Sequence, residues 1–404
     1  MTGRWWAMRS ALRRVRRVGP RGVLQRLAQR AYTASGAATL RFNLRLEDVL
    51  LDVPTSLPAP ASRPLPGTPV TVAWVMTPPA AGSGGHTTLF RMIAALEARG
   101  HRCVVYVYDK DGVDTAALDA RIREHWPAVA GRVRDVVAGI SGVDAVVATS
   151  WESAHLVVRY SREPVRRLYF LQDYEPYFYG HGAEYALAAM TYRLPFRRIA
   201  LGEMLDGMLR DATGLGSDVV PFGCDSEVYR PPEPGTPRAG VVFYCRPDFP
   251  RRGYEIAAVA LREFHRRHPD QRVHVYGTPP TDLGIPHVFH GRLTSAQLNE
   301  LYGSTVCGLA LSFTNITLVA EEMLAAGNIP VVNDMALARR VLSNPYVRWA
   351  EPTPGSLAQA LSSLVTRSDI EGAARVAAAS VVGRSWQPTC DAVVRIVEEE
   401  VYGS

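Results

Sequence analysis

Short apolar runs alternate with helical segments along most of this chain, in two successive series. A proline-rich break, RPPEPGTPRAG at residues 230–240, separates the two series. Alternation of this kind builds parallel, doubly wound sheets, which bind ligands at the carboxyl ends of their strands. The sequence therefore predicts an α/β protein with two facing domains and a cleft between them. The expected strands of the first series are VTVAWVM, CVVYVY, VDAVVAT, RRLYFLQD and a short one at VVPFG. Those of the second series are GVVFYCR, RVHVYG, a short one near VFHG, CGLALSF and IPVVND.

The breaks in the pattern divide the chain into five expected segments. Residues 1–53 form a basic arm, and the proline-rich stretch 54–68 forms a linker. Residues 69–229 and 230–385 form two Rossmann-like domains, and residues 386–404 form a helix that crosses back to the first domain. A length of 404 residues supports this division, because it exceeds what one ordinary hydrophobic core holds.

Composition excludes several classes of protein. A hydrophobic content of 47% with 21% charged residues is typical of a soluble globular chain. No apolar run approaches the roughly 18 to 20 residues of a membrane-spanning helix, and no apolar segment follows the first arginines as in a secretory signal. We therefore expect a cytoplasmic protein with reduced thiols. Its five cysteines have no metal-ligand spacing, so no metal site is expected; they are Cys103, Cys224, Cys245, Cys307 and Cys390.

The basic charge is concentrated at the start of the chain. Residues 1–46 contain eleven arginines and no Asp, Glu or Lys, while the whole chain has a net charge of +6. In the rest of the chain, the remaining 34 basic residues are outnumbered by 39 acidic ones. The basic charge thus belongs to an appendage and not to the body, which argues against a generally nucleic-acid-coating protein, and we expect no nucleic-acid partner.

The arm has an amphipathic pattern. Trp5, Met8, Leu12 and Val15 recur at helical spacing on one face, and arginines occupy the other faces. A basic amphipathic helix with tryptophans can lie on an anionic membrane surface. We therefore expect peripheral membrane contact through residues 1–31, at the inner face of the membrane. Packing of this helix on the body or on a partner protein is an equal alternative.

Two loops follow strand ends and precede helices. The first, Gly82 to His86, has glycines that let backbone N–H groups approach a phosphate at a helix N-terminus. A tight turn without a ligand explains this loop equally well. The second loop follows the expected strand end at Ser312, and its helix starts near Thr317. Glu322 lies in that helix, where a carboxylate could accept hydrogen bonds from sugar hydroxyls, whereas Glu321 is expected to be solvated.

A pair of arginines follows the first strand of the second series. Arg246 directly follows the expected strand, and Arg252 stands at the start of the next expected helix. Two guanidinium groups at one strand end suit a diphosphate leaving group, because negative charge builds on that group as a glycosidic bond breaks. Surface arginines are common, so the pair by itself favours neither alternative.

Taken together, these segments resemble the GT-B glycosyltransferases of family 4, over about residues 69 to 390. VVPFGCD followed by VYRP resembles the "vipNGvD…F.P" segment of that family, with Phe222 in place of Asn. Arg246 and Arg252-Gly253 resemble its "GRl…KG" phosphate-binding pair, and EEMLAAGNIPVV resembles "EAMAcG.PVV". The resemblance implies a GT-B fold, a nucleotide-sugar donor and transfer with retention of configuration, without an essential metal or cofactor.

A narrower resemblance is to the WsaF-type rhamnosyltransferases. It rests on GSGGHTT at 82–88, TSWESA at 149–154 and YFLQDYEPYFYGHGAEYALAAMTY at 169–192. The last segment stands where other members have a histidine-containing loop. The resemblance implies that its polar residues orient the sugar or the acceptor hydroxyl. The acceptor or sugar-binding residues are therefore predicted to be His86, Gln172, Asp173, Tyr174 and Glu175.

One position departs from the family pattern. In the E-x7-E motif, Glu322 fits the second Glu, which holds the ribose, but the first Glu falls on Thr314. Thr314 and Asn315 would offer neutral hydrogen bonds to the donor sugar instead. This change is compatible with a deoxy sugar, and we predict dTDP-L-rhamnose as the donor.

The resemblance implies a role for each group of residues. Arg246, Arg252 and Asp173 are the predicted catalytic residues. The acceptor is expected to be a glycan, a lipid-linked sugar or a small molecule. Three alternatives remain: a sugar-nucleotide epimerase with the same fold, a catalytically idle scaffold with the same fold, and a structural protein of the membrane surface. The predicted donor-binding residues are Gly84, Gly85, Arg246, Arg252, Thr314, Asn315, Ile316, Thr317 and Glu322.

Overall fold

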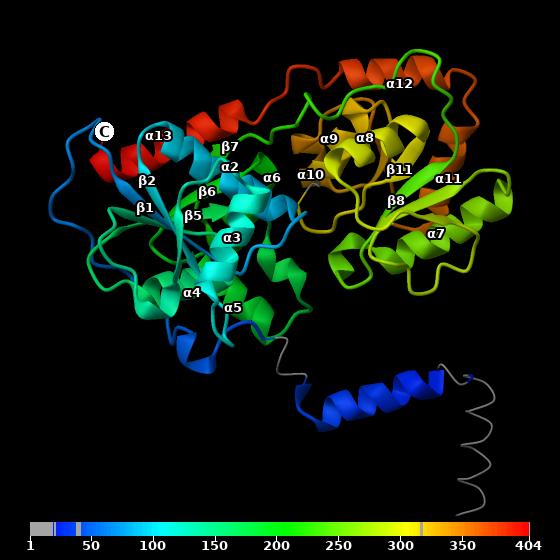
Figure 1. The fold of residues 1–404 in the computed structure, drawn as a ribbon. Coiled ribbons are helices and arrows are strands. Elements are labelled where there is room, and N and C mark those ends of the chain that lie inside the picture. Colours follow the sequence, from blue (N-terminus) through cyan, green and yellow to red (C-terminus); the bar gives the residue numbers. More distant parts are fainter. Residues whose placement is uncertain (1–18, 20–21, 38–41, 316–317, 404) are drawn as a thin grey trace, which may run out of the picture. The chain divides into compact units, whose positions relative to one another are not determined.

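The computed structural model describes residues 19, 22–37, 42–315 and 318–403 (Figure 1). The chain forms two compact units, residues 1–49 and residues 50–404. In the first unit, residues 22–34 are helical, and the short 3-10 helix η2 covers Leu46–Asp48. Trp5, Met8, Leu12 and Val15, which carry the predicted amphipathic pattern, lie outside the described residues.

The second unit begins with a seven-stranded sheet in which all neighbouring strands are parallel. Its order is β3-β2-β1-β4-β5-β6-β7, so the chain reverses its winding between β1 and β4. Five of the six residues of β1 are buried, as expected for a strand covered on both faces. The strands are β1 (Thr71–Met76), β2 (Arg102–Val107), β3 (Arg132–Asp135), β4 (Ala145–Ala148), β5 (Arg166–Leu171), β6 (Arg197–Leu201) and β7 (Asp218–Val220).

Helices of this first domain begin and end at residues that satisfy their backbone groups. The side chain of Asp114 accepts a hydrogen bond from Ala117 N–H at the start of α3. Ser150 and Ser153 form a capping box at the start of α4. The helices are α2 (Gly84–Ala98), α3 (Thr115–His125), α4 (Trp151–Tyr160), α5 (Ala183–Thr191) and α6 (Glu203–Thr213), with the 3-10 helices η3 (Val136–Ala138) and η4 (Glu175–Phe178).

The second domain has its own six-stranded parallel sheet and its own buried core. Its strand order, β10-β9-β8-β11-β12-β13, again reverses between the first and the fourth strand of the domain. The strands are β8 (Val241–Cys245), β9 (Val273–Gly277), β10 (Val288–Phe289), β11 (Cys307–Leu309), β12 (Ile329–Asn333) and β13 (Arg348–Ala350). The helices are η5 (Pro250–Arg252), α7 (Tyr254–Arg267), α8 (Ser295–Ser304), α9 (Leu318–Ala325), α10 (Ala336–Val341), α11 (Pro354–Val365) and α12 (Ile370–Ala379). The predicted α/β fold with two doubly wound domains is confirmed.

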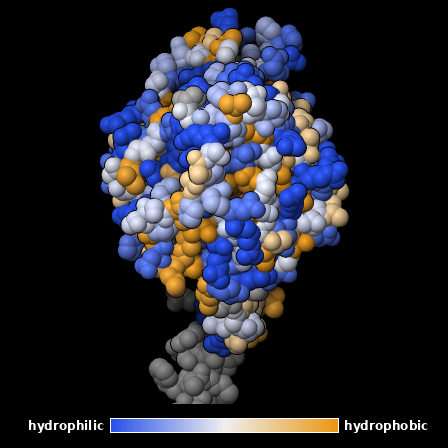
Figure 2. Space-filling model, turned by 90° about the vertical axis from the view of Figure 1, so that its left-hand side faces the viewer, coloured by the Kyte–Doolittle hydropathy of each residue, from blue (hydrophilic) through white to orange (hydrophobic). Residues whose placement is uncertain are grey.

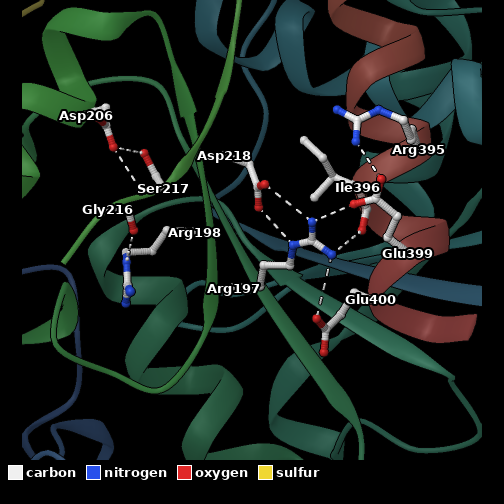
Figure 3. Close-up of polar contacts among 10 residues, drawn as sticks. All are labelled: Arg197, Arg198, Asp206, Gly216, Ser217, Asp218, Arg395, Ile396, Glu399 and Glu400. Carbon is white, nitrogen blue, oxygen red and sulfur yellow. Dashed lines mark hydrogen bonds and ion pairs between the residues drawn. The ribbon is translucent and has the colours of Figure 1, made fainter. Parts of the chain in front are cut away.

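The last helix, α13 (Gln387–Tyr402), packs on the first domain. Val393 and Val397 are fully buried among the residues of the first sheet. At the helix surface, the guanidinium of Arg197 on β6 lies between Asp218 of β7 and Glu399 of α13, at 2.8 and 2.7 Å (Figure 3). The buried valines of α13 and the ion pairs of Arg197 together hold this helix on the first domain.

The proline-rich stretch at 54–68 lies against the first domain. Arg167 donates a hydrogen bond to Pro58 O over 2.6 Å, and Arg166 donates one to Pro60 O over 3.0 Å. Arg63 donates to Glu400 O over 2.7 Å. Residues 54–68 form no strand, so their backbone carbonyls have no ladder partners, and the arginines of β5 use two of them as acceptors.

The molecular surface is largely hydrophilic on the side viewed in Figure 2, with apolar residues scattered over it. Among the described residues, no helix combines the length and the hydropathy that a membrane span requires. All five cysteines are buried free thiols.

Candidate functional site

A polar loop follows β5 at the carboxyl edge of the first sheet. Asp173 accepts a hydrogen bond from Tyr174 N–H through Oδ1, over 2.9 Å. Its other oxygen, Oδ2, accepts a hydrogen bond from the hydroxyl of Thr314, over 2.9 Å. Thr314 belongs to the loop after β11, so this bond joins the carboxyl edges of the two sheets. The structure thus brings together two residues that are 141 positions apart in the sequence.

Asn315 strengthens the same connection between the domains. Its side-chain N–H group donates to Gln172 O over 2.7 Å and approaches Leu201 O at 3.4 Å. Thr314 is fully buried and Asn315 is 4% exposed. The side-chain groups predicted to bind the donor sugar therefore already have partners across the domain boundary.

The loop after β11 is shaped by Asn333 at the end of β12. The side chain of Asn333 accepts a hydrogen bond from Ser312 N–H over 2.9 Å and donates one to Ser312 O over 2.7 Å. The backbone of Ser312 is thus bonded to a side chain and not to the backbone of a neighbouring strand. This explains why β11 ends at Leu309 and not at the predicted Ser312. Ile316 and Thr317, predicted to bind the donor, lie outside the described residues.

Helix α2 begins at Gly84 beside the loop after β5. Ser83 caps the helix by accepting from His86 N–H, and its hydroxyl lies 2.9 Å from His86 Nδ1. Gln172 donates to Gly85 O over 3.2 Å. A Cβ atom at Gly84 would meet no heavy atom within 4 Å, so the helix start faces open space. Burial lowers the pKa of His86.

Three arginines lie together at the carboxyl end of β8. Arg246 follows the strand, and η5 presents Arg251 and Arg252 next to each other. Each has a buried N–H group without a hydrogen-bond partner: Nε of Arg246, Nε of Arg251 and Nη1 of Arg252. Arg251 is absent from the predicted site. Its position directly before Arg252 could have indicated a role in the site, but an exposed side chain is the ordinary expectation for an arginine in a turn.

The acidic and basic groups of the two domains influence one another here. Burial raises the pKa of Asp173, and the guanidinium groups of Arg252 and Arg251 oppose that increase. Burial and the adjacent positive charge of Arg252 together lower the pKa of Arg251 to about 10. The site therefore contains cations that an additional anion would stabilise.

Two predicted acceptor-site residues have structural roles within the first domain. Glu175 accepts a hydrogen bond from Trp151 N–H at the start of α4, over 2.5 Å. Burial, with Glu152 nearby, raises the pKa of Glu175 well above its ordinary value. Tyr174 is only 4% exposed and packs against Tyr177 at 4.7 Å between ring centroids. Tyr174 therefore offers no open ring face to a sugar.

Glu322 lies on α9 next to a charged pair from the first domain. Burial and the nearby carboxylate of Asp225 raise its pKa to about 7, against the opposing effects of Arg91 and of a hydrogen bond with Tyr229. Arg91 pairs with Asp225 over 2.5 Å. A carboxyl group that titrates near neutral pH beside this pair can accept hydrogen bonds from hydroxyl groups once it is ionised.

Glu321 differs from its sequence-based prediction. It is 7% exposed and forms an ion pair with Arg384, which precedes the returning helix α13. The prediction of a solvated side chain was wrong, because the last segment of the chain covers this face of α9. Among the residues that the structure describes, no cluster of three or more metal-ligating side chains was found.

Comparisons with known proteins identify relatives of both domains. Family models described as WsaF, N-terminal domain, and WsaF, C-terminal domain, match residues 94–204 and 239–362. The chain is 31% identical over 340 residues to the O-antigen biosynthesis protein RfbC of Myxococcus xanthus, covering 77% of this chain. The alignment covers 26% of RfbC, so this chain corresponds to about a quarter of that relative. A phosphatidyl-myo-inositol mannosyltransferase of Mycobacterium tuberculosis is 26% identical over 222 residues, 50% of this chain and 59% of the relative.

Solved structures share the fold at low sequence identity. Sucrose-phosphate synthase from Thermosynechococcus elongatus has a TM-score of 0.62 at 14% identity, covering 83% of this chain and all of that one. Anabaena HepE in complex with UDP and glucose gives the same TM-score, identity and coverage. WaaG, a glycosyltransferase involved in lipopolysaccharide biosynthesis, has a TM-score of 0.58 at 13% identity, covering 82% of this chain and all of that one. These structures have the GT-B architecture.

Proposed function

The chain belongs to the WsaF family and has the GT-B fold, as its sequence predicts, and from this premise we propose that it is a retaining glycosyltransferase. The proposed donor is a nucleoside-diphosphate sugar, and the proposed acceptor is a glycan or a lipid-linked sugar of polysaccharide biosynthesis. The name of RfbC, an O-antigen biosynthesis protein, supports this class of acceptor. A small-molecule acceptor is the remaining alternative.

The observation that carries the proposal is the pair Arg246 and Arg252. Both lie at the carboxyl end of β8, and each has a buried N–H group without a partner. The two groups are suited to phosphate oxygens, because guanidinium groups bind them through charge-assisted hydrogen bonds. Glu322 is the proposed anchor for the ribose hydroxyls, and the open start of α2 at Gly84 and Gly85 is proposed to lie near the phosphates.

The proposed reaction needs no nucleophile from the protein. The bond between the anomeric carbon and the phosphate oxygen breaks, and the departing diphosphate accumulates negative charge that Arg246 and Arg252 stabilise. The acceptor hydroxyl forms the new bond from the same face and transfers its proton to a phosphate oxygen. Asp173 is proposed to orient the reacting hydroxyl. Closure of the two domains would exclude water from the reacting atoms.

The proposed sugar is L-rhamnose or another deoxy sugar, carried by dTDP. The support comes from Thr314, whose hydroxyl is engaged with Asp173 and which brings no carboxylate of its own. The carboxylate of Asp173 at this place already accepts hydrogen bonds from Thr314 and from Tyr174 N–H, so fewer acceptors remain for sugar hydroxyls, which suits a sugar that lacks one of them.

A thermal-shift screen of the full chain against dTDP-, UDP- and GDP-sugars tests the donor. The true donor should raise the free energy of unfolding by about 2.7 kcal/mol at 100 times its Kd. Transfer assays with the stabilising donor and lipid-linked acceptors should then give a product with retained configuration. An epimerised donor formed without acceptor would instead identify an epimerase, and stabilisation without turnover across the acceptor panel would identify a binding protein.

The basic arm is proposed to contact anionic lipid. Within the helix at residues 22–34, Leu24 and Leu27 are 68% and 55% exposed, and Arg26 and Arg30 are also exposed. Each arginine near an anionic surface contributes about 1 kcal/mol of attraction. Co-sedimentation of the full chain with vesicles containing phosphatidylserine, but not with phosphatidylcholine vesicles, would support this contact. Equal binding to both vesicle types would contradict it.

A further inference from the structure

Arg251 is held in place by the backbone of its turn. The chain reverses at Gly253, where φ is +63° and a Cβ atom would lie 2.9 Å from the ring of Phe313. Phe313 N–H donates to Arg251 O over 3.0 Å, so the loop after β11 is bonded to η5. These contacts fix the backbone from which the Arg251 side chain extends.

The Arg251 side chain lies against aromatic rings from both domains. Its Cζ atom is 3.9 Å from the ring centroid of Phe178 in η4 and 4.9 Å from that of Phe249. The Cζ atom of Arg246 lies 4.2 Å from the same Phe249 ring. Aromatic faces attract a guanidinium without neutralising its charge. Phe249 therefore holds two cations close together, and Phe178 connects one of them to the first domain.

The charge of this cluster is incompletely balanced. Within the part of the chain that the structure describes, no carboxylate lies within ion-pair distance of Arg251, although Asp173 and Glu175 are near enough to influence its pKa. Its buried Nε–H group has no acceptor. Neighbouring arginines and burial act in the same direction on its pKa, which is opposite to the effect of a bound anion.

We infer that Arg251 is a third ligand of the donor diphosphate, beside Arg246 and Arg252. This inference rests on the proposed function and adds a binding residue that the family pattern does not contain. Each of the three arginines has one buried N–H group that no acceptor of the described chain satisfies, and a diphosphate has oxygens for all three guanidinium groups. Arg251 also contacts Phe178 in η4, the element of the opposite domain that follows Asp173. Binding of the donor to Arg251 therefore restrains the position of η4.

The test compares neutral and charged replacements of Arg251. The probe is the nucleoside diphosphate of the donor found by the thermal-shift screen. Its Kd is measured by titration calorimetry at 50 and 200 mM salt, and the melting temperature of each variant is measured as well. Arg251→Gln removes the charge. Arg251→Met likewise removes the charge but retains the apolar stem, and Arg251→Lys retains the charge without the planar group. Arg266→Gln is the matched control, since Arg266 lies exposed on α7 and pairs with Glu263.

The inference predicts that Arg251→Gln and Arg251→Met each raise Kd at least tenfold and reduce its dependence on salt, while Arg251→Lys raises Kd by a smaller factor. The Arg266→Gln variant should bind as the unmodified chain does. If both neutral variants bind within twofold of the unmodified chain while Arg246→Gln and Arg252→Gln weaken binding, Arg251 is only a stacking residue and the inference is overturned. If the unmodified chain binds no nucleoside diphosphate, the proposed function fails together with it.

Discussion

The hydroxyl of Thr314 donates a hydrogen bond to the carboxylate of Asp173, and through it the second domain is bonded to the first. Thr314 stands where the family pattern has a carboxylate, and Asp173 brings a carboxylate to the same place from the other domain. The domain boundary at this point is polar and buried. Separating the domains would therefore break the hydrogen bonds of Thr314 and Asn315 with the first domain.

Removing this bond should weaken the closed arrangement of the domains. Thr314→Val keeps the shape of the side chain but leaves Asp173 without one donor, so the free energy of unfolding should fall by about 1 to 3 kcal/mol. Urea unfolding of Thr314→Val, Asp173→Asn and the double variant measures the coupling directly. Thr236→Val, at an exposed turn, is the control. Additive effects of the two changes would show that the bond contributes nothing.

The raised pKa of Glu322 predicts a dependence of donor binding on pH. Since its pKa is about 7, the side chain is partly protonated at neutral pH and accepts hydrogen bonds fully only above it. The affinity for the nucleotide sugar, whose diphosphate does not titrate in this range, should therefore increase between pH 6 and about pH 8. Calorimetry of the unmodified chain and Glu322→Gln checks this, with exposed Glu300→Gln as the control. An unchanged pH profile in Glu322→Gln would assign the titration to another group.

The same shift has an opposite consequence for stability. The native state retains the proton of Glu322 up to about pH 7, whereas the unfolded chain loses it near the ordinary value of 4.5. The contribution to the free energy of unfolding is thus fully present below about pH 4.5 and is lost as the pH rises to 7, by at most about 3 kcal/mol. Urea titrations at several pH values should show this slope in the unmodified chain and its loss in Glu322→Gln.

Arg246 should be required for turnover. Arg246→Ala removes a donor from the departing diphosphate, and loss of one such donor typically reduces kcat by about 100-fold or more. The change is measured by transfer of sugar from the donor identified in the screen, with Arg266→Gln as a control of similar charge. Near-normal kcat in Arg246→Ala would remove this residue from the mechanism.

Arg197 should stabilise the docked position of α13. Arg197→Ala leaves Asp218 and Glu399 without their partly buried partner and should cost about 1 to 3 kcal/mol (Figure 3). Arg395→Ala breaks only an exposed pair within the helix and should cost about 0.5 kcal/mol or less. The pairing lowers the pKa of Glu399, so its contribution is present above the ordinary carboxyl value and is lost as pH falls. Equal losses in the two variants, measured by urea unfolding, would contradict this assignment.

Gly223 should not tolerate a side chain. A Cβ atom there would lie 2.6 Å from the ring of Trp386, which leads into α13. Gly223→Ala must displace this buried ring, so it should destabilise the protein by about 1 to 3 kcal/mol. Gly355→Ala, where nothing lies within 4 Å, is the matched control and should be neutral in thermal unfolding. A Gly223→Ala protein with an unchanged melting temperature would show that Trp386 is free to move.

The pattern of apolar runs was sufficient to predict the two doubly wound domains and most of their strands. Buried parallel strands are nearly continuous apolar segments, and this property is local. Three strands were not predicted: β3 has the sequence RVRD, β6 has RRIAL, and β13 has RWA. The strands β3 and β13 lie at sheet edges, where solvent replaces one neighbour and polar residues are tolerated. The strand β6 lies inside the sheet, but its two leading arginines interrupt the apolar run.

The candidate site was only partly predictable. Arg246, Arg252 and Glu322 are predicted from the sequence because each falls in a motif that resembles the family pattern. Arg251 is not predicted, because its place between Phe178 and Phe249 depends on the approach of the two domains. Tyr174 and Glu175 are predicted from the narrower resemblance, but in the fold they belong to an aromatic cluster and to the start of α4.

The sequence by itself determined the local elements and the order in which they follow one another, because backbone preferences and apolar periodicity act between near neighbours. Only the tertiary structure decided which polar groups meet. Thr314 meets Asp173, and Glu321 meets Arg384, across long separations in the chain. Hydrogen bonds and ion pairs of this kind depend on the positions of a few atoms, which packing of the sheets and the return of α13 establish, and no local pattern encodes those positions.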